Sequence, residues 1–327
     1  MKRITSKTLL VLAFLVVTYT AYAQDWQSIE TTNTCTKRHE NAVAAVKGKV
    51  IVLGGRGDRP VESFDPRTRT WTKLADAPME LHHFQAVTYN DEVWVLGAFT
   101  GGYPHETPVP DIHIFNPATK EWRKGPAIPE DRRRGAAGVF VYKNKIYMVC
   151  GIQDGHWDGH VAWLDEYDPR TDTWKKLPDA PHARDHVQAV VINDKIWVAG
   201  GRKSTARTGR VIDPTLEEVD VFDFKTQTWT TLPASQNIPT RRAGNATVAF
   251  GSKVLVIGGE SGSQVAAHSE VEAFDTKSGK WEALPSLKQG RHGTGAVIIN
   301  GKIYIAAGSG NRGGGPELND IEVWSGK

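Results

Sequence analysis

Short apolar runs that end in a pair of small residues recur along the chain. The first, KVIVLGG at 49–55, returns in related form at 92–98, 145–151, 195–201, 253–259 and 302–308. Each copy follows a short turn such as VKG or IND, and each turn follows another small or apolar run, such as ENAVAAV or GTGAVII. Two such runs joined by a tight turn predict a β-hairpin, so each of the six copies is predicted to be strand, turn, strand.

A second pattern lies downstream of these hairpins. VESFDPRTRTWTKL at 61–74 returns as IHIFNPATKEWRKG, LDEYDPRTDTWKKL, VDVFDFKTQTWTTL and VEAFDTKSGKWEAL. It predicts a strand, a turn rich in Asp, Pro and Thr, and a strand that opens on a tryptophan. The tryptophans are Trp71, Trp122, Trp174, Trp229 and Trp281. At this regular spacing we interpret them as wedges between sheets rather than as sugar-stacking platforms.

Together the two patterns form a unit of four antiparallel strands that repeats roughly every fifty residues, a period typical of β-propellers. The sixth unit stops after NDIEVWSGK without its last strand, while QDWQSI at 24–29 carries a spare tryptophan, Trp26. The N-terminal segment is therefore expected to complete the last blade, which closes the ring and removes an exposed sheet edge. The prediction is an all-β, six-bladed propeller that forms a single domain over residues 24–327.

The glycine pair followed by the spaced tryptophan resembles the kelch repeat over the whole of that domain. In size, export signal and blade count the chain is similar to the sialic-acid mutarotases (N-acetylneuraminate epimerases), which are kelch propellers with a basic central site. This resemblance implies the propeller fold and an acidic sugar as substrate. The catalytic motif of the mutarotases has no residue-by-residue match in this sequence. Galactose oxidases also contain kelch blades, but they have seven and need a copper site with a cysteine-crosslinked tyrosine. Cys150 stands at a glycine-pair position, which argues against that chemistry.

Residues 1–23 have the pattern of a secretory signal peptide: a basic head, an apolar run at 9–17 and small residues around a cleavage point. The run is too short for a permanent membrane helix, and no second stretch is long enough. We therefore expect a periplasmic or secreted protein without a membrane anchor. The two cysteines, Cys35 and Cys150, permit at most one disulfide.

The charge balance of the chain limits the classes of partner that we expect it to bind. Without the three basic residues of the leader, the 37 remaining Lys and Arg residues equal the 37 Asp and Glu residues. A nucleic-acid partner is disfavoured by this balance. The glycine pairs do not predict a phosphate loop either, because no helix follows them and no Gly-Lys-Ser/Thr occurs.

The propeller geometry brings the start of each innermost strand and the end of the next strand to one face. Sixteen residues before each glycine pair, five of the six positions are arginine: Arg38, Arg134, Arg184, Arg242 and Arg291. Their forks suit a carboxylate, so they predict an anionic ligand such as a uronic, sialic or sulfated sugar. The alternative is structural: arginines that recur with the repeat bond the carbonyls and carboxylates of the blades. The two interpretations carry similar weight.

The next two positions hold residues that differ between blades and are better functional candidates. We predict Glu40, His83, His186 and His292 as catalytic residues that move protons. Further substrate-binding candidates lie beside them or directly after the glycine pairs: His39, His82, Arg56, Arg202 and Glu260. In the loop HWDGH, His156 and His160 are candidate ligands for a metal, and the cofactor such a site would take is a divalent ion.

Three functions fit this pattern. The first is an exported mutarotase- or epimerase-like enzyme that handles an acidic mono- or oligosaccharide. The second is a lyase acting on uronic acids, in which the histidines hold a metal or act as base. The third is a non-catalytic module that recognises a glycan or a protein on the same face. A propeller supports all three, so the fold does not decide between them.

Overall fold

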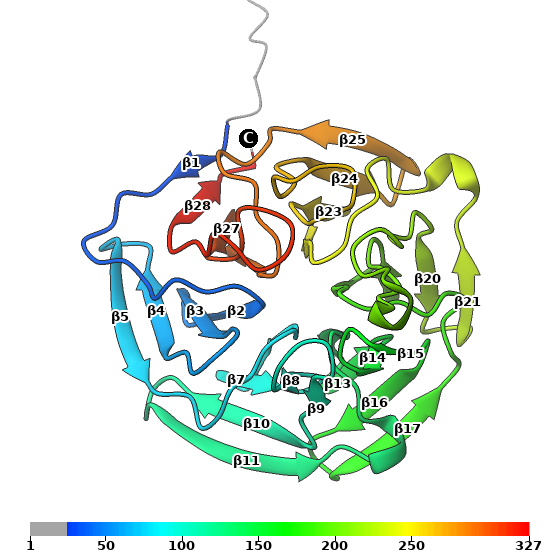
Figure 1. The fold of residues 1–327 in the computed structure, drawn as a ribbon, viewed down its shortest axis with the longest axis horizontal. Helices are drawn as coiled ribbons and strands as arrows, with labels where there is room; N and C mark the ends of the chain where they lie inside the picture. Colours follow the sequence, from blue (N-terminus) through cyan, green and yellow to red (C-terminus); the bar gives the residue numbers. More distant parts are fainter. Residues whose placement is uncertain (1–24, 327) are drawn as a thin grey trace, which may run out of the picture.

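The structure is a computed structural model that describes residues 25–326, so the predicted signal peptide at 1–23 lies outside the described residues. Six four-stranded antiparallel sheets stand around a central axis, as Figure 1 shows. This confirms the predicted six-bladed propeller. Within residues 25–326, no helix has the length and hydrophobicity needed to cross a membrane.

From the axis to the rim, the strands of each blade follow chain order, except that the outermost strand of blade six comes from the N-terminal end of the described chain. Blade one consists of β2 (Asn41–Val46), β3 (Lys49–Gly54), β4 (Val61–Asp65) and β5 (Thr70–Ala75). Blade two consists of β6 (Val87–Tyr89), β7 (Glu92–Val95), β10 (Asp111–Asn116) and β11 (Glu121–Ala127). Blade three consists of β12 (Gly138–Tyr142), β13 (Lys145–Val149), β16 (Leu164–Asp168) and β17 (Thr173–Leu177).

The second half of the ring repeats this order. Blade four consists of β18 (Ala189–Ile192), β19 (Lys195–Val198), β20 (Asp220–Asp223) and β21 (Thr228–Thr231). Blade five consists of β22 (Ala246–Phe250), β23 (Lys253–Ile257), β24 (Val271–Asp275) and β25 (Lys280–Leu284). Blade six consists of β26 (Ala296–Ile299), β27 (Lys302–Ala306), β28 (Ile321–Trp324) and β1 (Gln27–Ser28). Two small hairpins lie between blade strands: β8 (Phe99–Thr100) with β9 (Thr107–Pro108), and β14 (Ile152–Asp154) with β15 (Asp158–His160).

The N-terminal segment closes the ring, as predicted. β1 pairs antiparallel with β28, so that Gln27 lies opposite Val323, and the two ends of the described chain meet in one blade (Figure 1). Trp26 is fully buried and stacks on Trp324, with ring centroids 6.3 Å apart. The first described strand therefore takes the place of the fourth strand that the last repeat lacks.

The core is a set of separate interfaces between neighbouring blades. Alternate residues of a strand point to opposite faces of its sheet, so Ile51 and Leu53 of β3 pack toward blade two, while Val50 and Val52 pack toward blade six. The recurring tryptophans pack against these interface clusters, and each lies beside an aromatic side chain on the preceding strand. In blade one, the ring centroids of Phe64 and Trp71 lie 5.2 Å apart. The wedge interpretation of the tryptophans is thus confirmed.

The glycine pair is needed where two blades approach each other. Gly258 and Gly259 have φ values of 62° and 114°, in the region that favours glycine. A Cβ atom on Gly258 would lie 2.3 Å from the carbonyl oxygen of Arg291 in the next blade. The pair is therefore a backbone requirement of blade packing.

Both cysteines are free and buried. Burial raises the pKa of the Cys35 thiol to about 12 and that of the Cys150 thiol to about 11. Because the thiolate is the reactive species, we expect neither thiol to react with a thiol-specific dye on the native protein at pH 8. In denaturant both are expected to react, giving two thiols per chain. Stoichiometric labelling of the native protein would contradict this prediction.

Candidate functional site

Backbone hydrogen bonds join neighbouring blades at the throat of the propeller, at the residue two positions after each recurring arginine or, in blade two, after Leu81. This residue has positive φ in all six blades: Glu40 (56°), His83 (55°), Ala136 (51°), His186 (51°), Gly244 (61°) and Gly293 (62°). The amide of His83 donates to the carbonyl of Glu40 (2.9 Å), and the amide of Ala136 donates to that of His83 (2.8 Å). Charged or imidazole side chains at such positions carry backbone strain, which is typical of functional sites.

The five recurring arginines lie inside the blades and not at the throat. Each is at most 1% exposed. In blade five, Arg242 donates to the carbonyl oxygen of Gly258 (2.7 Å) and to the Glu272 carboxylate (2.6 Å). The same two kinds of partner hold the other four, whose carboxylate partners are Glu62 for Arg38, Asp165 for Arg134, Asp220 for Arg184 and Glu322 for Arg291. The prediction that these five arginines bind an anionic substrate is therefore wrong, because their donors serve the blade itself.

Blade two lacks both the recurring arginine and its carboxylate partner. Leu81 stands where the other blades have arginine, and His113 stands on β10 where they have the carboxylate. This joint exception was visible in the sequence, because the residue two positions before the recurring aromatic residue of each third strand is acidic wherever the arginine is present. The correlation indicates a buried ion pair repeated for structural reasons.

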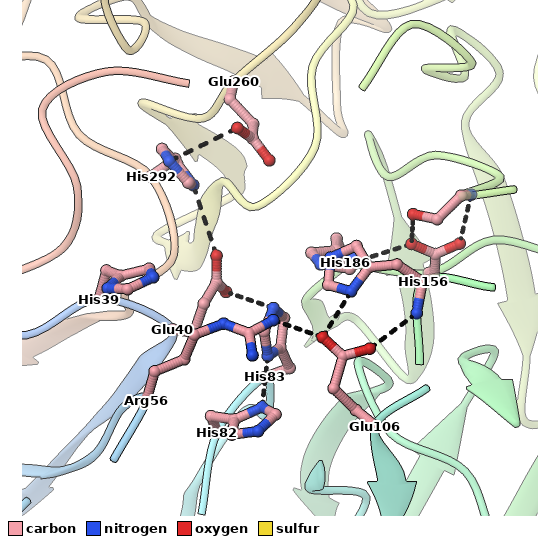
Figure 2. Close-up of polar contacts among 12 residues, drawn as sticks. His39, Glu40, Arg56, His82, His83, Glu106, His156, His186, Glu260 and His292 are labelled. Carbon is pink, nitrogen blue, oxygen red and sulfur yellow. Dashed lines mark hydrogen bonds and ion pairs between the residues drawn. The ribbon is translucent and has the colours of Figure 1, made fainter. Parts of the chain in front are cut away.

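The predicted catalytic residues do meet at the throat. The Glu40 carboxylate lies 3.5 Å from Nε2 of His83 and 3.7 Å from Nδ1 of His292. The other ring nitrogen of His292, Nε2, lies 3.5 Å from the Glu260 carboxylate. Figure 2 shows Glu40 between His83 and His292. All four side chains are at most 9% exposed, so these acids and imidazoles interact largely shielded from water.

A second group of imidazoles adjoins Glu40. His83, His156 and His186 come from three consecutive blades, and their ring centroids lie 4.7 to 5.1 Å apart. One ring nitrogen from each lies within 4.8 Å of the others. Of the two residues predicted as metal ligands, His156 thus belongs to this group. His160 does not, since its Nε2 hydrogen-bonds the backbone oxygen of Ser204 at 2.6 Å.

Electrostatics keep the acids charged and two of the imidazoles neutral. Burial raises the pKa of Glu260, but His292, Arg202 and the amide of Gly313 outweigh it and bring the pKa to about 2. Burial likewise opposes ionisation of Asp185, while a hydrogen bond from His186 holds its pKa well below the usual range. Burial is the main reason that the pKa values of His83 and His186 are lowered.

The other predicted binding residues surround this centre. Arg202 is buried and pairs with Glu260, while Arg56 is partly exposed and pairs with Glu106. His82 is fully buried and contacts His83, and the Nδ1 atoms of the two rings lie 2.6 Å apart. His39 hydrogen-bonds the carboxylate of Glu317 at 2.8 Å.

Three further residues contact the candidate site and were not among the predictions. Glu106, on the loop of blade two, accepts hydrogen bonds from both Nδ1 (2.8 Å) and the backbone amide (2.9 Å) of His156. Asp185 accepts from Nδ1 of His186 at 2.5 Å and from the Ser204 hydroxyl at 2.7 Å. Tyr103 is 59% exposed beside His156. The Asp185–His186 pair was readable as neighbouring residues, whereas the contact of Glu106 with His156 joins two loops fifty residues apart.

A cavity of about 510 Å³ opens above these groups. Glu40, His83 and His156 line it together with Arg56 and Glu260, and its remaining lining is His39, Tyr103, Arg202, Val211, Ile212, Gly313 and Gly314. This volume is within the range of small-molecule sites. The cavity combines charged and imidazole groups with an exposed aromatic ring and two aliphatic side chains.

These features define a six-bladed kelch-type propeller with a buried acid and imidazole centre under one mouth. The chain belongs to the Attractin/LZTR1 beta-propeller family, which matches residues 10–267, and a kelch motif matches residues 290–325. Kelch-like protein terF of Aspergillus terreus is 28% identical over 287 residues, covering 83% of this chain and 61% of that protein. Kelch-like protein 38 of Rattus norvegicus is 24% identical over 282 residues, covering 84% of this chain and 44% of that protein.

Solved structures share the architecture. The structure of YjhT superimposes with a TM-score of 0.73 at 16% sequence identity, covering 90% of this chain and 99% of that one. At this identity the likeness extends to the fold. The chain spans less than two thirds of the length of the two Kelch-like relatives named above, so those relatives contain further sequence that this chain does not match.

Proposed function

We propose that the chain is an exported, sugar-active enzyme whose substrate enters the mouth cavity and exchanges protons with the centre beneath it. The observation that carries the proposal is the floor of the 510 Å³ cavity, where Glu40 and His83 lie next to each other and face the space a ligand would occupy. A carboxylate and imidazoles within reach of one ligand are the groups that general acid–base catalysis uses. Proton transfer of this kind serves ring opening, epimerisation and elimination alike.

The walls support a saccharide as the substrate class. Tyr103 presents an exposed aromatic face, which suits the apolar C–H face of a sugar ring. Around it, Arg56, His39 and Glu260 offer donors and acceptors for hydroxyl groups. With the five recurring arginines engaged inside the blades, the partner we assign to a sugar carboxylate is Arg56, whose side chain is 23% exposed.

The proposal is tested with the full chain and a panel of neutral sugars, uronic acids and sialic acid. Calorimetry reports binding, NMR reports faster anomeric exchange or epimerisation, and ultraviolet absorbance reports an unsaturated uronate. We expect binding of at least one class together with one of these reactions. Binding without turnover would leave only a recognition module. The absence of both binding and turnover would overturn the proposal.

Two variants locate the substrate. Tyr103→Ala is expected to weaken saccharide binding about 2- to 10-fold, because it removes the aromatic face. Arg56→Lys keeps the positive charge but loses the planar guanidinium group, so it is expected to weaken the binding of acidic sugars more than the binding of neutral sugars. Equal affinities of wild type and both variants for every sugar would place binding elsewhere.

A further inference from the structure

We propose that His83, His156 and His186 together bind one divalent transition-metal ion of the zinc class, with the Glu40 carboxylate beside it and an open side toward the mouth cavity. The proposal does not need the saccharide proposal to hold, and it is tested without sugar. Its starting point is the convergence of one nitrogen from each ring to within 4.8 Å. The argument then depends on which nitrogen of each ring is free.

Hydrogen bonds on the far side of each ring set its tautomer. Carboxylates accept only, so Nδ1 of His156 donates to Glu106 and Nδ1 of His186 donates to Asp185. Each ring therefore carries its lone pair on Nε2. This carboxylate–imidazole arrangement is the one that orients metal-binding histidines.

His83 reaches the same state through a second histidine. Nε2 of His82 lies 3.0 Å from the carbonyl oxygen of Gly101, which only accepts, so His82 carries its proton on Nε2. Nδ1 of His82 must then accept, and Nδ1 of His83, 2.6 Å away, must donate. All three imidazoles are thus fixed with Nε2 unprotonated.

These lone pairs lack adequate donors inside the protein. Among residues 25–326, Nε2 of His186 is buried without a hydrogen-bond partner. Nε2 of His83 faces a carboxylate oxygen of Glu40 at 3.5 Å, which sets two acceptors against each other. Nε2 of His156 has a long contact of 3.4 Å to the Arg202 guanidinium. A cation bound among the three rings would satisfy the first two nitrogens directly.

The charge balance favours a dication. Four buried carboxylates surround the rings, and two guanidinium groups, Arg56 and Arg202, pair with two of them. The four are Glu40, Glu106, Asp185 and Glu260. The four carboxylates outnumber the two guanidinium groups by two, and buried charge without compensation is costly. One divalent ion removes this excess.

The donor set indicates the metal. Three imidazoles suit zinc and its neighbours nickel, copper and cobalt, whereas calcium and magnesium prefer oxygen ligands. Nitrogens bound to one tetrahedral zinc lie roughly 3.4 Å apart, so metal binding requires the three rings to move closer together than the 4.8 Å within which their nitrogens now lie. Three histidines with one position open to a cavity are typical of catalytic rather than structural zinc sites.

The test measures metal binding directly. The full chain is stripped with a chelator, titrated with ZnCl₂ by calorimetry, and analysed for metal after gel filtration. We expect about one zinc per chain, with affinity lowered at least 100-fold by His83→Ala or His186→Ala. His105→Ala is the matched control, because His105 is an exposed histidine at the same mouth and pairs with Asp154; its affinity is expected to equal that of wild type.

A second pair of more conservative variants tests the site if an alanine variant fails to fold. Glu106→Gln and Asp185→Asn keep the rings and remove the carboxylate behind them, so each is expected to weaken zinc binding about 10- to 100-fold. Absence of stoichiometric zinc, or zinc binding that all four variants leave unchanged, would overturn the metal site. Zinc binding without sugar turnover would count against the saccharide proposal alone, and turnover that survives chelation would count against a catalytic role of the metal.

Discussion

Glu40→Gln is expected to lower saccharide turnover by about 10²- to 10⁴-fold, the usual contribution of a positioned proton-transfer group. The amide has the size of the carboxylate but cannot take up a proton, and it loses the charge that faces His83 and His292. Substrate affinity is expected to change only a few-fold, because most of the cavity lining is untouched. Turnover is measured by the NMR or absorbance assay that detects the wild-type reaction.

The matched control for this variant is Glu282→Gln. Glu282 lies on the outer strand β25 and pairs with Lys253 at the protein surface, far along the blade from the throat. Its removal is expected to leave turnover unchanged. If Glu40→Gln retained wild-type turnover with an intact fold, the proton-transfer role of Glu40 would be excluded.

Arg242→Leu is expected to destabilise the protein by about 3–5 kcal/mol, because it leaves the Glu272 carboxylate buried without its partner. It also leaves the carbonyl oxygens of Gly258 and Val256 without the guanidinium donors that they have in the native blade. The measurement is the free energy of unfolding from denaturant titration, followed by circular dichroism.

Two further variants separate the buried pair from a general effect of lost charge. Arg241→Leu changes the neighbouring arginine, whose side chain is 59% exposed, and is expected to cost less than about 0.5 kcal/mol. Arg242→Leu combined with Glu272→His copies the natural arrangement of blade two, Leu81 with His113. This double variant is expected to be more stable than Arg242→Leu alone. A loss below 1 kcal/mol for Arg242→Leu would contradict the structural role of the pair.

The arginines show why a recurring residue was harder to interpret than a variable one. Their position before the first strand placed them correctly at the mouth end of each blade, but a side chain as long as arginine can point into the blade or into the channel. Only packing decides, and here the backbone carbonyls of the glycine pair and an acid on the third strand capture all five. The variable positions were better guides, since Glu40, His83 and His186 face the axis from the left-handed throat position.

The sequence by itself determined the six blades, the closure by Trp26 and the face on which Glu40, His83, His186 and His292 gather. Those features follow from local periodicity and turn chemistry, which neighbouring residues encode. The tertiary structure alone decided that His156 joins His83 and His186 and that Glu106 stands behind it. These contacts join loops of different blades, whose separation depends on how the blades pack around the axis rather than on spacing along the chain.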